Sequence, residues 1–317
     1  NFKITRRWCL DLVSLDIFGM LGFWLESWTF YCSVRKYLHE QKGEVYYTRD
    51  LSLAYWLSKK VSPLYYEIHT LPDKISSKYR ETWRRCKGLV VISSGLKNEL
   101  IKQGVNENKI LVARDAVDLK MFENLPDKIG CRQKLKLPIY KKIALYSGHL
   151  YEWKGADVLA ETAGLLPEGV LIYLVGGTNK DVKKFRKKYQ FSNLKIIGWR
   201  PSSEIPFWLK AADILVLPNI ASEKISSHYT SPLKLFEYMA SGVPIIASDL
   251  PSIREVLNEK NAVLFPHGNI EELKKSIGFV LQNNDFSDRI SHSAYTDSKQ
   301  YNWLERAKKI WNLVNKK

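Results

Sequence analysis

The stretch 228–249, HYTSPLKLFEYMASGVPIIASD, constrains the fold of this chain more than any other segment. Ser231 followed by Pro232 is typical of a helix start, with the serine as N-cap and the proline at the first helical position. Ser241-Gly242 is the expected helix end, and the apolar run Val243 to Ser248 fits a buried parallel strand. The sequence therefore predicts a helix whose N-terminus opens at the edge of an α/β sheet.

Such a helix start suits an anion. The backbone N–H groups of the first turn have no partner inside the helix, and the helix dipole is positive at that end. We therefore predict a phosphate site at Ser231, Pro232 and Leu233, with Lys234 as an additional cation that could equally face solvent. Glu237 is an acid within an otherwise apolar helix, so it needs donors such as sugar hydroxyls. The alternative is a packed helix with one solvated acid.

The rest of the chain alternates strand and helix patterns in both halves, which predicts doubly wound parallel sheets. Ligands of such sheets bind at the carboxyl ends of the strands. In the first half we expect helices over 16–39, 50–60, 76–86 and 93–103 and strands over 44–48, 63–68, 88–92 and 109–113. In the second half we expect strands over 143–146, 171–175, 194–197, 213–218, 243–248 and 262–265 and helices over 232–240, 251–257, 271–282 and 301–311.

With 317 residues, two domains are the natural expectation. The strand and helix pattern is lost from residue 119 to 141. We predict a first domain over 1–120, a linker over 121–141 and a second domain over 142–299.

The charge of the chain is strongly basic, with a formal net charge of +16 shared between both halves. This indicates a broad positive surface for anions such as nucleotides, anionic lipid headgroups or nucleic acid. A generally Lys-rich proteome would explain the same charge. No nucleic-acid-binding motif is present, so we do not expect nucleic acid as a partner.

The four cysteines are far apart and form no Cys-x-x-Cys pair, so neither a zinc site nor thiol redox chemistry is indicated. We expect free, buried thiols and a cytoplasmic location. The most apolar stretch, from Trp8 to Tyr31, contains three acidic residues, which argues against a membrane span. We predict neither a metal nor a cofactor.

A second group of chemically suited residues follows the strand predicted at 143–146. Gly148 would let the backbone approach a ligand closely, and Lys154 would supply a mobile ammonium for a diphosphate. His69 and Arg49 lie at the ends of strands predicted in the first half. A lone histidine is more often a core or surface residue than a catalytic one.

Together these segments resemble the retaining group 1 glycosyltransferases, glycosyltransferase family 4, over about residues 44 to 317. The family pattern Glu-x7-Glu-(Ala/Tyr)-Met-Ala-x-Gly-x-Pro is similar to 229–244 here, with Glu237 as the second Glu and Tyr229 in place of the first. The segment from Gly148 to Gly155 resembles the family's Gly-Arg-x-x-x-x-Lys-Gly element, with His149 in place of the arginine. The runs YEIHTLP, VISSGLK and KILVA resemble family segments of the first domain.

The resemblance implies a GT-B fold of two Rossmann-like domains, with the terminal helix 300–317 joined to the first. It implies that His149 and Lys154 contact the donor diphosphate, and that Tyr229 and Thr230 line the sugar pocket. Glu237 would bind the ribose, Trp199 and Arg200 would contact the nucleobase, and His69 would reach the donor sugar. On this resemblance His69, Lys154 and Glu237 are the catalytic candidates.

The activity implied is transfer of a sugar, with retention, from a UDP- or GDP-sugar to a glycan or lipid-linked acceptor in polysaccharide or glycolipid assembly. A peripheral contact with the anionic inner face of a membrane is part of this expectation. The family's opening strand and Gly-rich loop have no counterpart before residue 43, where Gly19 and Gly22 lie within a helical pattern. We therefore expect an incomplete first domain with fewer strands than the second. A catalytically inactive partner subunit and, less favoured, a basic nucleic-acid-binding protein are the alternatives.

Overall fold

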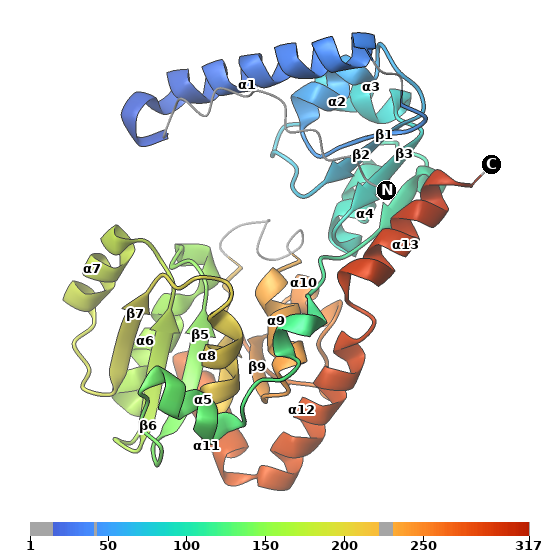
Figure 1. Cartoon of the computed structure of the whole chain (residues 1–317). Helices are drawn as coiled ribbons and strands as arrows, with labels where there is room; N and C mark the ends of the chain where they lie inside the picture. Colours follow the sequence, from blue (N-terminus) through green and yellow to red (C-terminus); the bar gives the residue numbers. More distant parts are fainter. Residues whose placement is uncertain (1–14, 41–42, 222–230, 317) are drawn as a thin grey trace. The chain divides into compact units, whose positions relative to one another are not determined.

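The computed structural model describes residues 15–40, 43–221 and 231–316 (Figure 1). By their internal contacts these residues form two compact units. The smaller unit takes its described residues from 1–67 and 74–89, and the larger from 68–73 and 90–317. Tyr229 and Thr230, which we predicted to line a sugar pocket, lie outside the described residues.

The elements of the first 112 residues follow the predicted order closely. They are α1 (Leu15–Glu40), β1 (Tyr46–Thr48), α2 (Leu51–Leu57), β2 (Leu64–Ile68), α3 (Ser77–Arg85), β3 (Gly88–Val91), α4 (Ser94–Lys102) and β4 (Ile110–Val112). The four strands form a sheet in the order β1-β2-β3-β4, with β1 and β2 parallel. Gly19 and Gly22 lie within α1, as their sequence context predicts.

The second half continues as an α/β domain. Its helices are α5 (Lys128–Leu135), α6 (Ala156–Thr162), α7 (Asn179–Lys188), α8 (Ile205–Ala211), α9 (Leu233–Ser241), α10 (Pro251–Arg254), α11 (Ile270–Gln282), α12 (Asn284–Ser298) and α13 (Trp303–Val314). Its strands are β5 (Lys142–Ser147), β6 (Val170–Val175), β7 (Leu194–Gly198), β8 (Ile214–Leu217), β9 (Ile245–Ser248) and β10 (Val263–Phe265).

These six strands form a parallel sheet in the order β10-β9-β8-β5-β6-β7. The chain adds strands on one side of β5 through β7 and then returns to the other side of β5 with β8. The order therefore reverses between β5 and β8, and this is the point where doubly wound sheets bind ligands. The described residues contain four strands in the first sheet and six in the second.

Both faces of the six-stranded sheet are covered, which explains why its strands read as continuous apolar runs. Ile143 and Leu145 of β5 join a core cluster built with α5, α8, α9, α10 and α12. Ala144 and Tyr146 point to the other face and join a cluster built with α6, α7 and α11. The alternation along one strand thus distributes neighbouring side chains between two separate cores.

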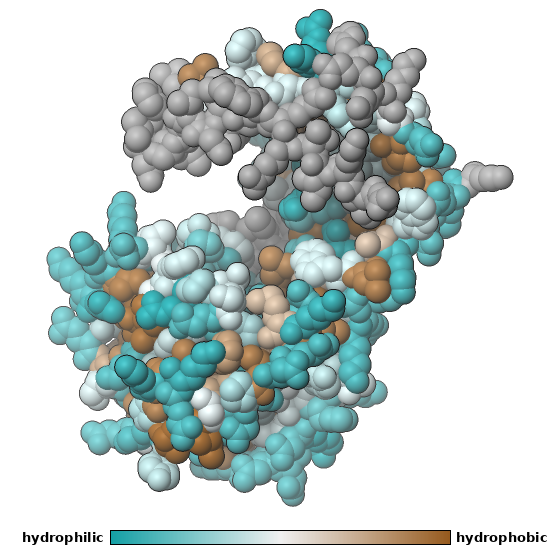
Figure 2. Space-filling model, viewed as in Figure 1, coloured by the Kyte–Doolittle hydropathy of each residue, from teal (hydrophilic) through white to brown (hydrophobic). Residues whose placement is uncertain are grey.

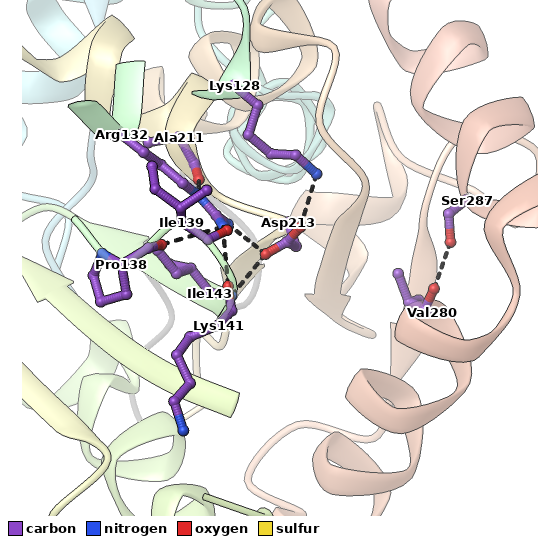
Figure 3. Close-up of polar contacts among 10 residues, drawn as sticks. All are labelled: Lys128, Arg132, Pro138, Ile139, Lys141, Ile143, Ala211, Asp213, Val280 and Ser287. Carbon is purple, nitrogen blue, oxygen red and sulfur yellow. Dashed lines mark hydrogen bonds and ion pairs between the residues drawn. The ribbon is translucent and has the colours of Figure 1, made fainter. Parts of the chain in front are cut away.

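The stretch 121–141, which we expected to be a linker without regular structure, contains helix α5. Asp127 caps this helix by accepting a hydrogen bond from Gly130 N at 2.8 Å. Arg132, which is buried, donates to Asp213 Oδ2 at 2.6 Å and to the carbonyl of Ala211 at 2.8 Å (Figure 3). The reasoning from composition missed this helix because its anchor is a buried ion pair rather than an apolar stripe.

The carboxylate of Asp213 accepts two further hydrogen bonds. Besides Arg132, it accepts from Lys128 Nζ at 2.8 Å and from Ile143 N at 2.8 Å (Figure 3). Burial works to raise the pKa of Asp213, but these hydrogen bonds and the nearby cations outweigh it and hold the pKa below its usual value. Helix α5 is therefore anchored to the core cluster that it forms with α8, α9, α10 and α12.

The burial of the cysteines differs in part from the expectation. Cys86 and Cys131 are free and buried, but Cys32 on α1 is free and exposed, so the expectation of burial was wrong there.

Hydrophilic side chains cover much of the visible face of the larger unit, with apolar residues scattered among them (Figure 2). Among the described residues, no helix combines the length and apolarity needed to cross a membrane.

Candidate functional site

The candidate site lies at the carboxyl ends of β5 and β8, where the strand order reverses. Strand β5 ends at Ser147 and continues into Gly148, whose φ of +134° is a conformation that favours glycine. Gly176, after β6, has a φ of +128°, and a Cβ there would lie 2.2 Å from the carbonyl oxygen of Gly148. Two glycines therefore let the ends of neighbouring strands approach each other as bare backbone.

The segment after Gly148 is held against the end of β8. A short 3₁₀ turn, Glu152–Lys154, ends at Gly155, which has a φ of +69°. A Cβ at Gly155 would lie 1.8 Å from the carbonyl oxygen of Pro218, so no side chain fits there. Ile220 N donates to the carbonyl of Trp153 at 3.0 Å and fixes the same approach. This packing places the backbone of Lys154 beside the end of β8.

Helix α9 begins one residue later than its sequence predicts. Pro232 is the N-cap residue and makes no side-chain capping bond, so the assignment of Ser231 as N-cap was wrong. The Ser231 hydroxyl instead accepts a hydrogen bond from Asp115 N at 3.0 Å. A proline in the N-cap position has neither a capping oxygen nor an N–H. The first N–H groups of α9, those of Leu233 and Lys234, therefore start a helix without a side-chain cap.

Lys234 is the most unusual residue of the site. Its side chain is 7% exposed, and its Nζ has no hydrogen-bond partner among the described residues. The Nζ lies 4.1 Å from the centre of the Tyr146 ring. Burial, with the nearby charge of Lys154, lowers the pKa of Lys234 well below its usual value, and Glu237 opposes this only in part. The suggestion that Lys234 faces solvent was wrong.

Lys154 and Glu237 both lie within electrostatic reach of Lys234. Burial lowers the pKa of Lys154. It raises the pKa of Glu237, against the opposing effect of the Lys234 charge. The structure thus brings together three of the predicted residues, two cations and one carboxyl group. All three are partly desolvated, which strengthens their interactions with a charged ligand.

The other predicted residues follow the ends of strands β5, β7 and β2. His149 is exposed and stacks on Tyr151, with ring centres 5.0 Å apart and planes at 4°. Trp199 is 69% exposed after β7, and Arg200 donates to the Trp199 carbonyl at 2.9 Å. His69 follows β2 and is half-buried. Their proposed roles stay predictions.

Several polar groups at the site were not singled out from the sequence. Tyr146 donates from its hydroxyl to the His149 carbonyl at 2.6 Å. Ser147 N donates to the Tyr238 hydroxyl at 2.8 Å. Asn219, after β8, and Ser248, at the end of β9, are buried, and their side-chain polar atoms have no partner in the described part of the chain. Only the position of Asn219 directly after the predicted strand 213–218 could have indicated it.

A separate cavity of about 330 Å³ lies at the opposite, C-terminal end of α9. Its lining includes Lys210, Ser241, Gly242, Asp288 and His292. Lys210 Nζ donates to the Ser241 carbonyl at 3.3 Å. None of the buried polar atoms without a partner in the described residues lies in this cavity. We therefore place the candidate site at the other end of the helix. No group of three His, Cys, Asp or Glu side chains suited to a metal occurs among the described residues.

The fold and the site define a doubly wound α/β protein with a cationic site at the switch point of its second sheet. Residues 141–283 match the family of group 1 glycosyl transferases. This match covers all six strands of the second sheet, so the likeness to the group 1 glycosyltransferases is carried by that domain. The resemblance drawn from the motifs is thereby confirmed.

Two curated relatives show the extent of the likeness. An uncharacterized glycosyltransferase of Methanocaldococcus jannaschii is 26% identical over 261 residues, covering 77% of this chain and 64% of that protein. The amylovoran biosynthesis glycosyltransferase of Erwinia amylovora is 27% identical over 192 residues, covering 58% of this chain and 45% of that protein. The matches thus span about half to two thirds of the length of these relatives.

Solved structures show the fold. Anabaena Alr3699/HepE in complex with UDP superposes with a TM-score of 0.76 at 19% identity, over 89% of this chain and 81% of that protein. The same protein has also been solved with UDP-glucose, with a TM-score of 0.74. The fold of this chain is GT-B, as predicted.

Proposed function

We propose that this protein transfers a sugar from a UDP- or GDP-sugar to an acceptor hydroxyl, with retention of the anomeric configuration. The observation that carries the proposal is the buried ammonium of Lys234, which has no hydrogen-bond partner in the described residues and lies on the first turn of α9. A buried cation without a partner costs free energy. A ligand anion between α9 and the Gly148 turn recovers it.

A diphosphate fits the arrangement of donors better than a single carboxylate. The N–H groups of Leu233 and Lys234 face one end of the site, while the ammonium groups of Lys154 and Lys234 supply two positive charges. Two desolvated cations match the charge of a nucleoside diphosphate, the group that leaves when the sugar is transferred. The bond from the anomeric carbon to the phosphate oxygen breaks, a new bond forms to the acceptor oxygen, and the acceptor's proton passes to the leaving diphosphate oxygen.

Charge stabilisation of the leaving diphosphate is the main catalytic contribution in this proposal. Lys154, Lys234 and the dipole of α9 are fixed in a partly desolvated site before the negative charge develops, so little reorganisation is needed. We include no metal ion, because these groups already meet the charge. Nucleotide binding is therefore expected to be the same with EDTA as with added magnesium.

The remaining predicted residues would bind the rest of the donor. Glu237, one turn after the start of α9, would accept hydrogen bonds from the ribose. The Gly198 turn with Trp199 and Arg200 would contact the base. We propose that His69 contacts the donor sugar, because its segment resembles the one that carries the family histidine. Tyr229 and Thr230 would line the same sugar pocket. The crystal complexes of the Anabaena protein with UDP and UDP-glucose support a nucleotide-sugar donor.

The acceptor we propose is a glycan or a lipid-linked sugar, at the cytoplasmic face of an anionic membrane. The name of the Erwinia relative supports polysaccharide assembly. The net charge of +16 and the exposed cations of α7 support contact with anionic headgroups. These α7 residues are Lys180, Lys183, Lys184, Arg186, Lys187 and Lys188.

Calorimetry with UDP, GDP and inorganic pyrophosphate tests the proposal, followed by donor consumption with UDP- and GDP-sugars. We expect one nucleotide to bind more tightly than the other and more tightly than pyrophosphate. A Lys154→Ala variant should lose most of this binding, while Lys210→Ala, at the far end of α9, should retain it. Absence of binding by all three ligands overturns the proposal. Nucleotide binding without turnover of any sugar donor identifies the inactive partner subunit instead.

A further inference from the structure

The Lys234 ammonium and the Gly148 turn share one neighbour, the side chain of Tyr146. Tyr146 is fully buried, and its ring centre lies 4.1 Å from Lys234 Nζ. Its hydroxyl donates to the carbonyl oxygen of His149 at 2.6 Å. One side chain thus contacts both groups that face the proposed diphosphate, one through its ring face and the other through its hydroxyl.

The backbone of Gly148 lies near both Tyr146 and Lys234. A Cβ at Gly148 would lie 3.4 Å from the Tyr146 hydroxyl oxygen and 3.8 Å from Cδ of Lys234. The Lys234 stem and the Tyr146 hydroxyl therefore both lie close to the turn at Gly148. Tyr238 constrains the same turn from α9, since its hydroxyl accepts from Ser147 N at 2.8 Å. The turn is held from both faces of the sheet by tyrosine hydroxyl groups.

We propose that Tyr146 is a positioning residue of the donor site, whose ring holds the Lys234 ammonium and whose hydroxyl sets the His149 carbonyl, so that α9 and the glycine turn meet the diphosphate together. This inference rests on the proposed function. The ring face is the negative end of an aromatic quadrupole and attracts a cation, most strongly when both are desolvated. The ring keeps the ammonium in place and leaves its charge intact, whereas a carboxylate would neutralise it.

The ring also favours the charged form of Lys234, which gives the proposal a measurable signature. Among the described residues, the charged groups that act on Lys234 are Lys154, from the turn before α6, and Glu237, on its own helix. Tyr146 adds a neutral ring. A diphosphate binds the protonated lysine, so affinity falls as the pH rises through the pKa of Lys234 in the unliganded protein. Weakening the ring interaction should move this fall to lower pH.

Three replacements at position 146 separate the two roles. Tyr146→Phe keeps the ring and deletes the hydroxyl, so affinity for the preferred nucleotide should drop about tenfold at every pH. A trifluorinated phenylalanine at 146 keeps the ring volume but weakens its negative face. Relative to Tyr146→Phe, it should lower the midpoint of the pH-dependent loss of binding by about one unit. Tyr146→Leu should lower the midpoint at least as far.

Tyr173→Phe is the matched control, because Tyr173 is a buried tyrosine on the neighbouring strand β6 that faces the other core. Its midpoint and affinity should equal those of the wild type. If the fluorinated and unfluorinated variants share one midpoint, Tyr146 is only a packing residue and the inference is wrong, even though the wild type binds nucleotide. If the wild type binds neither nucleotide nor pyrophosphate, the proposed function fails and the inference fails with it. The fluorinated pair remains informative should Tyr146→Leu not fold.

Discussion

Two helices in the larger unit, α4 and α9, have N-termini that are used in opposite ways. At α4, the carboxylate of Glu255 accepts from Ser94 N at 2.9 Å and from Gly95 N at 3.2 Å. Arg114 completes the contact, with Nη2 at 2.7 Å from Glu255 Oε2. At α9, the described residues supply no anion, and a buried ammonium lies on the first turn instead.

The difference separates a structural anion site from a binding site. In α4 the chain itself provides the carboxylate that satisfies the helix start, and a cation balances it. In α9 the Lys234 ammonium adds a second positive charge to the positive end of the helix dipole, and among the described residues only Glu237 opposes it in part. A helix N-terminus by itself therefore does not indicate ligand binding, whereas the sign of the charge placed beside it does.

The largest effect is expected from Lys234→Met, which keeps the length of the side chain and removes the charge. Nucleotide affinity should fall by about 100-fold, the size of a lost charge-assisted hydrogen bond. The unliganded variant should nevertheless be more stable than the wild type, by about 1 kcal/mol, because it lacks a buried cation that has no hydrogen-bond partner among the described residues. Calorimetry and thermal unfolding measure the two changes, and Lys210→Met serves as the control. Reduced stability of the unliganded variant would contradict the interpretation that the buried Lys234 cation destabilises the unliganded protein.

The reverse pattern is expected at α4. Glu255→Ala should lower the free energy of unfolding by about 2 kcal/mol, since it leaves Arg114 and two helix N–H groups without their carboxylate. Nucleotide binding should stay within about twofold of wild type, because the site at α9 is unchanged. Denaturant unfolding gives the first quantity and calorimetry the second. Glu259→Ala, at an exposed acid that pairs with Arg254, should change neither.

The pH dependence of binding sharpens the contrast further. The pKa values of Lys154 and Lys234 are lowered in the unliganded protein, and a bound diphosphate should raise both. Binding therefore takes up protons, and affinity should fall as the pH rises toward the ordinary lysine value of about 10.4. The terminal phosphate of UDP loses its last proton at about pH 6. A loss of affinity above pH 7.5 therefore comes from titration of the protein. A flat affinity from pH 7.5 to 9.5 would count against both lysine assignments.

The smallest effect is expected at His149, the exposed residue that stacks on Tyr151 where the family pattern has arginine. His149→Arg adds one permanent charge near the turn, so nucleotide affinity should rise about threefold at low salt. The gain should shrink at high ionic strength because the position is exposed. Calorimetry at two salt concentrations measures it, with His149→Gln as the neutral control. An equal gain in both variants would exclude a charge effect.

The strand and helix sequence was predictable because local signals and packing agree in most elements. Strands such as β6 and β8 are buried on both faces and read as unbroken apolar runs. Helix α9 carries its Gly242 end signal. Helix α5 was missed because its fixed point, the Arg132–Asp213 pair, joins residues 81 positions apart. Ser231 was misassigned because its hydroxyl accepts from Asp115 N, a partner that only the folded chain brings near.

The sequence by itself indicated the family resemblance, the parallel strands and the candidate residues Lys154 and Glu237, because these follow from short-range patterns of residue type. Only the tertiary structure decided that Lys234 is buried beside Tyr146 and that Glu255 fills the start of α4 while no described side chain fills that of α9. The physical reason is that burial and ion pairing depend on which distant segments meet. The spacing of residues along the chain does not contain that information.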